Sequence, residues 1–220
     1  VLIRDDEEVR IHPHYGVFSP VRSEYIDLVL NAPLPVALKQ NSVAFDIGTG
    51  TGVLATVLAL RDIQKITATD LSDRAIACAQ DNIDQLMLNT QIKISKANLF
   101  PEGKAALIVC NPPWLPARPS SALEHAVYDP ESQMLKGFLE KLKDHLLPNG
   151  EGWLILSDLA EHLGLRTREE LLNWIDQAGL KVTSRIDTRP THQKAFDKAD
   201  ALHAARSLEI TSLWRLSPTI

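Results

Sequence analysis

The sequence predicts a doubly wound α/β domain built on a mostly parallel sheet. Short apolar runs alternate with longer segments of helical spacing, which is the pattern of successive βαβ units. The chain has 220 residues, 45% of them hydrophobic, so it is long enough for one domain with a sizeable core. The connection 187–207, which precedes the last run, lacks the pattern of a crossover helix. We therefore expect the last strand to run antiparallel to its neighbours.

Seven apolar runs are the expected strands. The first, 42–47, is short and ends at a turn signal, as a buried parallel strand does. Residues 1–18 alternate in part and predict a short strand or hairpin ahead of the sheet. The other six runs share the character of the first: 65–70, 91–95, 105–110, 152–157, 180–186 and 208–216.

Five helices are expected around these strands. Ser19, Ser72 and Thr167 have the side chains that cap helix N-termini, and each precedes a segment of helical composition. We divide the chain into an N-terminal extension, 1–41, whose helix completes the site, and a main domain, 42–220. The expected helices are 20–30, 51–61, 72–88, 134–147 and 167–178.

Charge, cysteine content and hydropathy narrow the function classes. The net charge is −5, whereas a domain that grips a phosphate backbone usually carries a basic excess, so nucleic acid is disfavoured as the main partner. Cys78 and Cys110 are expected to be buried reduced thiols, which fits a cytoplasmic location. No apolar run approaches the about 18 residues that span a bilayer, so no membrane association is expected. His12 and His14 lack further ligands in the sequence, and we expect no metal.

A glycine-rich segment, Asp46-Ile47-Gly48-Thr49-Gly50-Thr51-Gly52, follows the first expected strand. Its glycines remove side chains where the backbone turns sharply and a ligand approaches closely. Val53 follows Gly52, whereas a Walker loop ends in Gly-Lys-Ser/Thr, and the glycine spacing is G-x-G-x-G rather than the G-x-G-x-x-G of a dinucleotide site. Asp46 would repel a pyrophosphate. The segment therefore suits a cationic or zwitterionic ligand.

A second acid, Asp70, ends the next expected strand, where a carboxylate can accept both hydroxyls of a ribose. The acid, the three glycines and this second acid together resemble the class I S-adenosylmethionine-dependent methyltransferases, from about residue 42 onward. The resemblance implies S-adenosylmethionine as the cofactor and a strand order of 3-2-1-4-5-7-6 with strand 7 antiparallel. It also implies that Leu71 flanks the adenine ring and that Asn98 lies near the adenine amine. The cofactor residues expected are Asp46, Gly48, Thr49, Gly50, Gly52, Asp70, Leu71 and Asn98.

A second motif, Asn111-Pro112-Pro113-Trp114, follows the expected strand 105–110. A planar NH₂ group is a poor nucleophile because its lone pair is delocalised, so its methylation needs acceptors in fixed positions. The Asn111 side-chain oxygen and the Pro112 carbonyl can accept both N–H bonds and aim the lone pair at the methyl group. Pro112 and Pro113 fix φ and remove two donors. Trp114 offers a flat face for stacking. These four residues are the expected catalytic set.

The motif resembles amino-methyltransferases with an Asn-Pro-Pro-aromatic motif, most closely the release-factor glutamine methyltransferases. Their Pro-Arg-Pro-Glu-like segment is loosely matched by Phe18-Ser19-Pro20-Val21-Arg22-Ser23-Glu24, and their Tyr-Glu-Pro-like element by Tyr128-Asp129-Pro130. The chain departs from them in having Trp114 where Tyr is usual. Glu131-Ser132-Gln133-Met134-Leu135 replaces a Gly-rich segment.

Three functions remain open. The favoured one is methyl transfer to a planar amide or amine nitrogen of a protein side chain such as glutamine. The alternative is methyl transfer to an exocyclic amine of RNA, adenine N6 or guanine N2. The basic residues of 187–207 could then contact the RNA backbone. We expect instead that this stretch is a solvated helical insertion. A catalytically idle cofactor-binding module is least favoured. We expect Asp158 and His162 to be ordinary loop residues rather than part of the site. The sequence indicates no oligomeric state.

Overall fold

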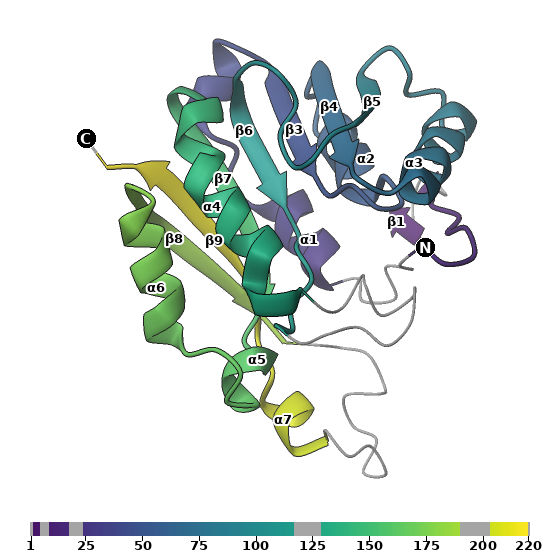
Figure 1. The fold of residues 1–220 in the computed structure, drawn as a ribbon. Coiled ribbons are helices and arrows are strands. Elements are labelled where there is room, and N and C mark those ends of the chain that lie inside the picture. Colours follow the sequence, from purple (N-terminus) through teal and green to yellow (C-terminus); the bar gives the residue numbers. More distant parts are fainter. Residues whose placement is uncertain (1, 5–8, 18–23, 117–128, 190–202, 220) are drawn as a thin grey trace.

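A computed structural model describes residues 2–4, 9–17, 24–116, 129–189 and 203–219. Its centre is a seven-stranded sheet in the order β5-β4-β3-β6-β7-β9-β8 (Figure 1). All pairs formed between β3, β4, β5, β6 and β7 are parallel, whereas β9 pairs antiparallel with both β7 and β8. Numbered along the sheet domain, this is the order 3-2-1-4-5-7-6, so the predicted fold class and the antiparallel last strand are confirmed.

The strands of the sheet are buried in the middle and more exposed at the edges. β6 is buried at every position, while β5 and β8 at the two edges alternate or are half-buried. A strand such as β6, which has a neighbouring strand on each side and helices over both faces, is therefore an uninterrupted apolar run in the sequence. The strands are β3 (Val43–Ile47), β4 (Lys65–Asp70), β5 (Ile92–Lys96), β6 (Ala105–Cys110), β7 (Leu146–Ser157), β8 (Leu180–Thr188) and β9 (Thr211–Pro218).

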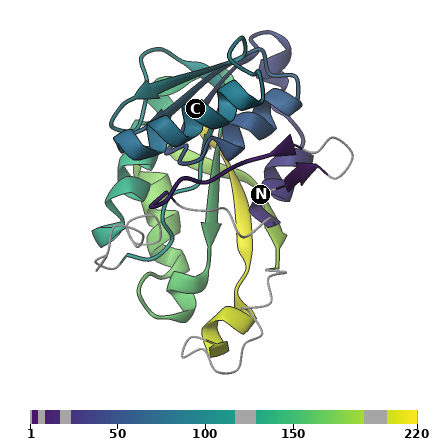
Figure 2. The same cartoon turned by 90° about the vertical axis from the view of Figure 1, so that its right-hand side faces the viewer.

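Helices cover both faces of the sheet (Figures 1 and 2). Helices α1, α2 and α3 share one hydrophobic core with the sheet, and α4 and α6 share another on the opposite face. The longer helices are α1 (Glu24–Asn31), α2 (Val53–Leu60), α3 (Asp73–Gln85), α4 (Gln133–His145) and α6 (Arg168–Gln177). The short ones are η1 (Val36–Lys39), η3 (Pro130–Ser132), α5 (Leu159–His162) and α7 (His203–Leu208). No helix within the described ranges is long and apolar enough to cross a bilayer.

Two of the predicted caps form. The Ser72 side chain accepts a hydrogen bond from the Ala75 N–H at the start of α3. At the start of α6, Thr167 and Glu170 bond each other's backbone N–H groups in a capping box. Ser19 lies outside the described residues, so its capping stays a prediction.

Several element boundaries differ from those predicted. We expected one helix to reach Leu147 and the next strand to start at residue 152, but α4 ends at His145 and β7 starts at Leu146. Leu147 precedes Pro148, and the residue before a proline is pushed out of the helical region into extended backbone. The last strand starts at Thr211 rather than 208, because Leu208 ends α7.

The N-terminal segment, residues 9–17, is hydrogen-bonded to α3. Strands β1 (Leu2–Arg4) and β2 (Val9–Arg10) pair antiparallel, as the expected hairpin does. Beyond them, the His12 N–H donates to Asn82 Oδ1 at 2.8 Å, and Asn82 Nδ2 donates back to the His12 carbonyl at 3.1 Å. This reciprocal pair carries the following residues toward the carboxyl edge of the parallel strands.

Candidate active site

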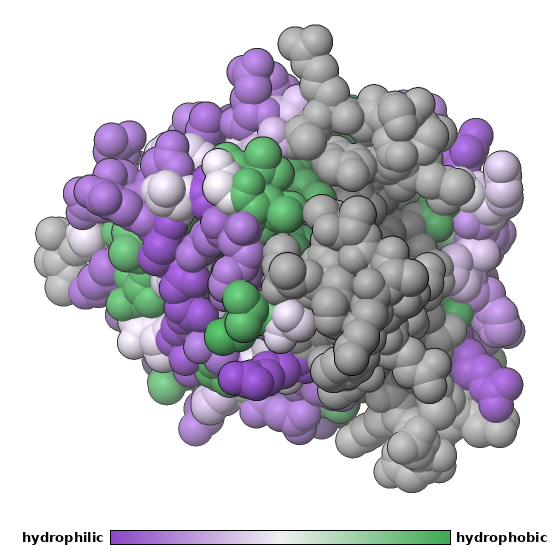
Figure 3. Space-filling model, turned by 90° about the horizontal axis from the view of Figure 1, so that it is seen from below, coloured by the Kyte–Doolittle hydropathy of each residue, from purple (hydrophilic) through white to green (hydrophobic). Residues whose placement is uncertain are grey.

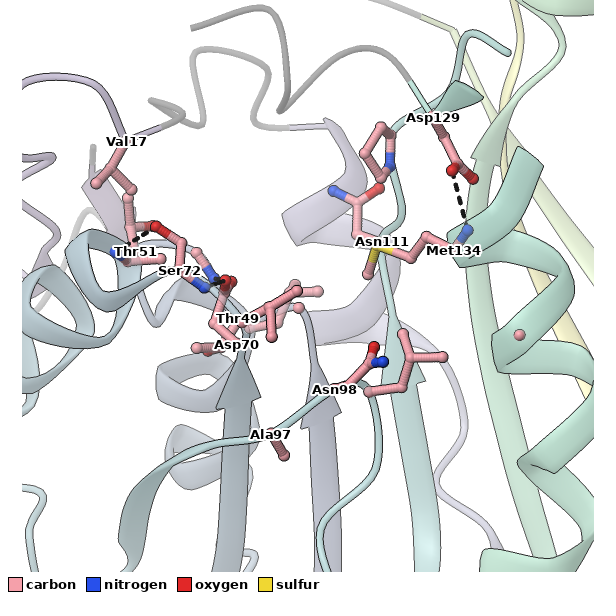
Figure 4. A pocket seen from close by; sticks show the side chains of 18 of the residues that line it. Val17, Thr49, Thr51, Asp70, Ser72, Ala97, Asn98, Asn111, Asp129 and Met134 are labelled. Carbon is pink, nitrogen blue, oxygen red and sulfur yellow. Dashed lines mark hydrogen bonds between the residues drawn. The ribbon is translucent and has the colours of Figure 1, made fainter. Parts of the chain in front are cut away.

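Three adjacent strands end level with one another. Ile47 of β3 is paired with Thr69 of β4 on one side and with Cys110 of β6 on the other. The residues that follow, which include Asp70 and Asn111, therefore leave the sheet at the same edge. They line one cavity of about 750 Å³ (Figure 4), a size within the usual range for sites of small molecules and cofactors.

The walls of the cavity come from several separate parts of the chain. The glycine loop after β3, the segment after β4 and β5, the motif after β6 and the first turns of α4 all contribute. Of the predicted site residues, eight line it: Gly48, Thr49, Gly50, Asp70, Leu71, Asn98, Asn111 and Pro113. The other four are not among the described lining residues: Asp46, Gly52, Pro112 and Trp114.

The glycine loop owes its shape to left-handed backbone and to bonds from its neighbours. Gly48, Gly50 and Gly52 have φ of +71°, +57° and +82°, which favour glycine. The Gly50 N–H donates to Asp70 Oδ2 at 3.0 Å, which ties this loop to the end of β4. A Cβ on Gly50 would meet nothing within 4 Å. The backbone there is open for a ligand to approach.

Asp46 lies beneath this loop and is 1% exposed. Its Oδ2 accepts hydrogen bonds from Thr49 Oγ1 at 2.6 Å and from the Ala55 N–H at 3.0 Å. Its Oδ1 is buried without a hydrogen-bond partner among the described residues. Burial raises the pKa of Asp46 to about 6, although both hydrogen bonds act to lower it. At neutral pH the loop therefore rests on a buried negative charge, which suits a cationic ligand above it.

The end of β4 combines polar and apolar surface. Asp70 is half-buried, and its Oδ1 accepts from the Ser72 N–H at 2.9 Å. A carboxylate has about four acceptor positions, so both oxygens keep capacity for a ligand hydroxyl. Leu71 beside it is 64% exposed, and Asn98 is exposed at the wall. Acceptors next to an apolar side chain match the ribose and the base of a nucleoside.

The motif after β6 is held by its own side chains. The indole Nε1 of Trp114 donates to Asn111 Oδ1 at 2.9 Å. The Trp114 ring packs against the core under α4 and α6. Asn111 and Pro113 face the cavity, whereas Pro112 is buried. The stacking role expected for Trp114 remains a prediction.

Asp129 lines the cavity, and sequence reasoning had not placed it there. It is 5% exposed, and it accepts hydrogen bonds from the backbone N–H groups of Met134 and Leu135 at 2.9 and 3.1 Å. Burial raises its pKa, while the helix amides and the cation of Arg166 act to lower it. The available signal was the Tyr128-Asp129-Pro130 element, of which Tyr128 lies outside the described residues.

The segment that replaces a Gly-rich stretch keeps a glycine-like backbone. Glu131 and Ser132 have φ of +57° and +56°. Left-handed backbone costs a residue with a Cβ about 1 kcal/mol. The turn places the Met134 side chain over the glycine loop. Its methyl carbon lies so close to Gly48 that a Cβ at that position would clash with it.

The N-terminal extension also reaches the cavity, through Gly16, Val17 and Tyr25. Nothing in the local sequence shows this, since it depends on the bonds between residue 12 and α3. Residues 18–23, with the Pro-Arg-Pro-Glu-like match, lie outside the described ranges. That residues 1–41 complete the site stays a prediction, which the positions of Gly16, Val17 and Tyr25 in the cavity lining support.

Asp158 and His162 are absent from the described cavity lining. Asp158 Oδ1 accepts from the Ile210 N–H at 2.7 Å and lies 3.4 Å from His162 Nε2, so it joins the end of β7 to the start of β9. Within the described ranges, no three His, Cys, Asp or Glu side chains gather as metal ligands. Cys78 and Cys110 are buried free thiols, as expected.

The carboxyl edge of the sheet opens onto the face seen from below in Figure 3. Most of the coloured surface on that face is hydrophilic, with small separate hydrophobic patches. The part of the face that can be described is therefore polar in character.

The comparisons with known proteins agree with this architecture. The family model of the methyltransferase small domain matches residues 8–172. A relative from Methanocaldococcus jannaschii, provisionally named a protein N5-glutamine methyltransferase, is 25% identical over 82% of this chain and 89% of its own length. The tRNA1(Val) (adenine(37)-N6)-methyltransferase of Shewanella loihica is 28% identical over 93% of this chain and 85% of its own. A methyltransferase structure from Pyrococcus furiosus superposes with a TM-score of 0.59 at 22% identity, covering 94% of this chain and 87% of that one.

Proposed function

Because the chain belongs to the methyltransferase small domain family, we propose that its S-adenosylmethionine-dependent reaction methylates a planar amide or amine nitrogen. The acceptor in this proposal is a protein side chain such as glutamine. One observation carries it. Asn111 and Pro113 line the same cavity as Gly50 and Asp70, so an acceptor nitrogen and a nucleoside cofactor have room to meet.

The residues present fit S-adenosylmethionine. The open backbone at Gly50 gives a close approach, and the unpartnered oxygen of buried Asp46 supplies negative charge for a cation. We assign Asp70 to the ribose hydroxyls, Leu71 to the adenine ring and Asn98 to the adenine amine. When bound, the cofactor supplies an electrophilic methyl group on a sulfonium.

In the proposed mechanism the chain orients the acceptor rather than activating it with a strong base. Asn111 Oδ1 and the Pro112 carbonyl accept the two N–H bonds of the target NH₂. With both bonds held, one face of the target nitrogen would be turned toward the methyl group, and after the new N–C bond forms the nitrogen would release one of its two protons to solvent. Fixing two reactants in this way can supply a large part of a rate enhancement. Pro112 and Pro113 keep the acceptors in place by restricting φ.

The charge of the cavity favours a protein side chain over RNA. Its described charged lining residues are Asp70, Asp129, Glu140 and Lys141, an acidic balance that matches the net charge of −5 for the chain. Among these described lining residues three acids face one lysine, so a phosphate backbone would meet a mostly acidic surface there. The alternative, an exocyclic amine of RNA, is kept because the Shewanella relative is named for a tRNA adenine.

The test uses cell extract incubated with the enzyme and radiolabelled S-adenosylmethionine. The labelled products are divided and treated with protease or with RNase. We expect protease to release the label and RNase to leave it. Label released by RNase alone would overturn the protein acceptor and establish the RNA alternative. Parallel incubation with the Asn111→Ala variant gives the background from other enzymes.

A further inference from the structure

The hydrogen bond between Trp114 and Asn111 fixes which way the Asn111 amide points. An indole Nε1–H can only donate, so the atom 2.9 Å from it has to be the oxygen of the amide and not its NH₂. This fixes the positions of both amide atoms. The amide oxygen has two lone pairs, of which the indole uses one.

The backbone of the motif does not fix this amide by itself. Pro112 and Pro113 restrict the chain after Asn111, but the terminal torsion of an asparagine side chain is broad and roughly two-fold. Turning it by about 180° exchanges the oxygen and the NH₂ with little change in shape. An outside partner is needed to choose between the two orientations.

Trp114 is suited to be that partner. Its ring packs against the core between the sheet and the helices α4 and α6, and it is not among the described residues that line the cavity. The ring is thus held by packing, and its N–H is presented to Asn111 from the protein side. The cavity side of the amide stays available to a ligand.

We propose that Trp114 is a positioning residue whose indole N–H holds Asn111 Oδ1 ready to accept from the target nitrogen. This inference rests on the proposed function, because it gives Asn111 its role as acceptor. With the amide turned over, its NH₂ would face the NH₂ of the target, donor against donor. The bond therefore selects the productive orientation before the acceptor arrives.

The activity test removes the indole N–H in two variants, of which the first keeps the shape of the fused ring. In one variant benzothienylalanine, in which sulfur replaces the indole N–H, stands at position 114; the second is Trp114→Phe. We expect turnover on the protein fraction of cell extract to fall about tenfold, the value of about one hydrogen bond. The cofactor dissociation constant should stay within about twofold. Trp174→Phe, on α6 and away from the cavity lining, is the matched control and should keep full turnover.

A second readout reports the bond without any acceptor. The chain has four tryptophans, so a nitrogen-15 spectrum gives four indole N–H signals. In the Asn111→Ala variant we expect solvent exchange of the Trp114 signal to accelerate about tenfold or more. The Trp153 signal should keep its rate, because that indole donates to Glu151 at 3.1 Å instead.

The outcomes separate this inference from the function on which it rests. Full turnover in both Trp114 variants, with Asn111→Ala inactive, would overturn the positioning role and leave the proposed function standing. Unchanged exchange of the Trp114 indole in Asn111→Ala would overturn it as well. Full turnover in Asn111→Ala would instead refute the proposed function itself.

Discussion

The two loops that meet at the cavity are stabilised in different ways. The loop after β3 is fixed by its surroundings: Gly50 donates to Asp70 on the next strand, and Ala55 donates to Asp46 beneath it. The loop after β6 is fixed from within, by consecutive prolines and by the bond from Trp114 to Asn111. A loop that must let a ligand reach its backbone can have few side chains of its own. A loop that must present one side chain can be stiff.

Because the two loops are held differently, we expect substitutions in them to affect different measured properties. Changes around the first loop should alter cofactor binding and stability together, because the same carboxylates serve both. Changes in the second loop should alter the transfer step and leave cofactor binding intact.

Asn111→Ala should lower turnover by about a thousandfold or more. The variant removes the side-chain acceptor that aims the target nitrogen, and misplaced reactants lose most of the advantage of being held together. Turnover is measured with radiolabelled cofactor on the protein fraction of extract. Trp174→Phe controls for a general effect of substitution. A loss of less than tenfold would contradict the role of Asn111.

Asp70→Ala should raise the cofactor dissociation constant about a hundredfold. It removes a charged acceptor for the ribose and also the partner of the Gly50 N–H, and hydrogen bonds to charged groups are worth about 1.5–3 kcal/mol each. Asp70→Asn keeps one acceptor oxygen and should show a smaller rise. Titration calorimetry gives both values. An unchanged constant in Asp70→Ala would refute the ribose assignment.

Asp46→Asn should stabilise the cofactor-free protein at pH 7 by about 3 kcal/mol, or on the order of a hundredfold in the unfolding constant. Burial raises the pKa of Asp46 to about 6, from a usual value of 3.8. The native state therefore binds more protons than the unfolded state between these values, and stability is lost as the pH rises from about 4 to about 6. The amide that replaces the carboxylate carries no charge, so the variant escapes this loss.

Urea unfolding at pH 4, 5, 6 and 7 measures the effect for Asp46→Asn. The gap between variant and wild type should open between pH 4 and pH 6 and then stay constant. The same variant should bind S-adenosylmethionine more weakly, since the negative charge beneath the loop is lost. A gap that does not change with pH would refute the buried charge at Asp46.

Gly50→Ala and Gly103→Ala form a matched pair with the smallest expected effect. Both glycines have positive φ, +57° and +97°, and a Cβ on either would meet nothing within 4 Å. Each variant should lose about 1 kcal/mol of stability from backbone strain. Only Gly50→Ala should weaken cofactor binding, by about tenfold, because only Gly50 lines the cavity. Equal cofactor affinity in the two variants would contradict the role of the loop.

The sequence was most informative where function depends on the ends of strands. Alternating apolar and helical segments predicted the sheet, and the acid or amide after each strand predicted Asp70 and Asn111 at one edge. Parallel strands bring their carboxyl ends together whatever the details of packing. The resemblance added the strand order.

What the sequence did not predict depends on contacts between distant parts of the chain. Gly16 and Val17 reach the cavity because residue 12 bonds to Asn82, 70 positions away. Asp129 enters it through the backbone of α4. The bond from Trp114 to Asn111 spans only three positions, but it depends on side-chain torsions that a motif does not specify.

The most direct test of the division between the loops is the cofactor dissociation constant of Asn111→Ala, measured by titration calorimetry beside wild type and Asp70→Ala. We predict a constant within about twofold of wild type, in a variant that has lost transfer. A rise as large as that of Asp70→Ala would show that the loop after β6 also binds the cofactor, and would contradict the division of roles between the two loops.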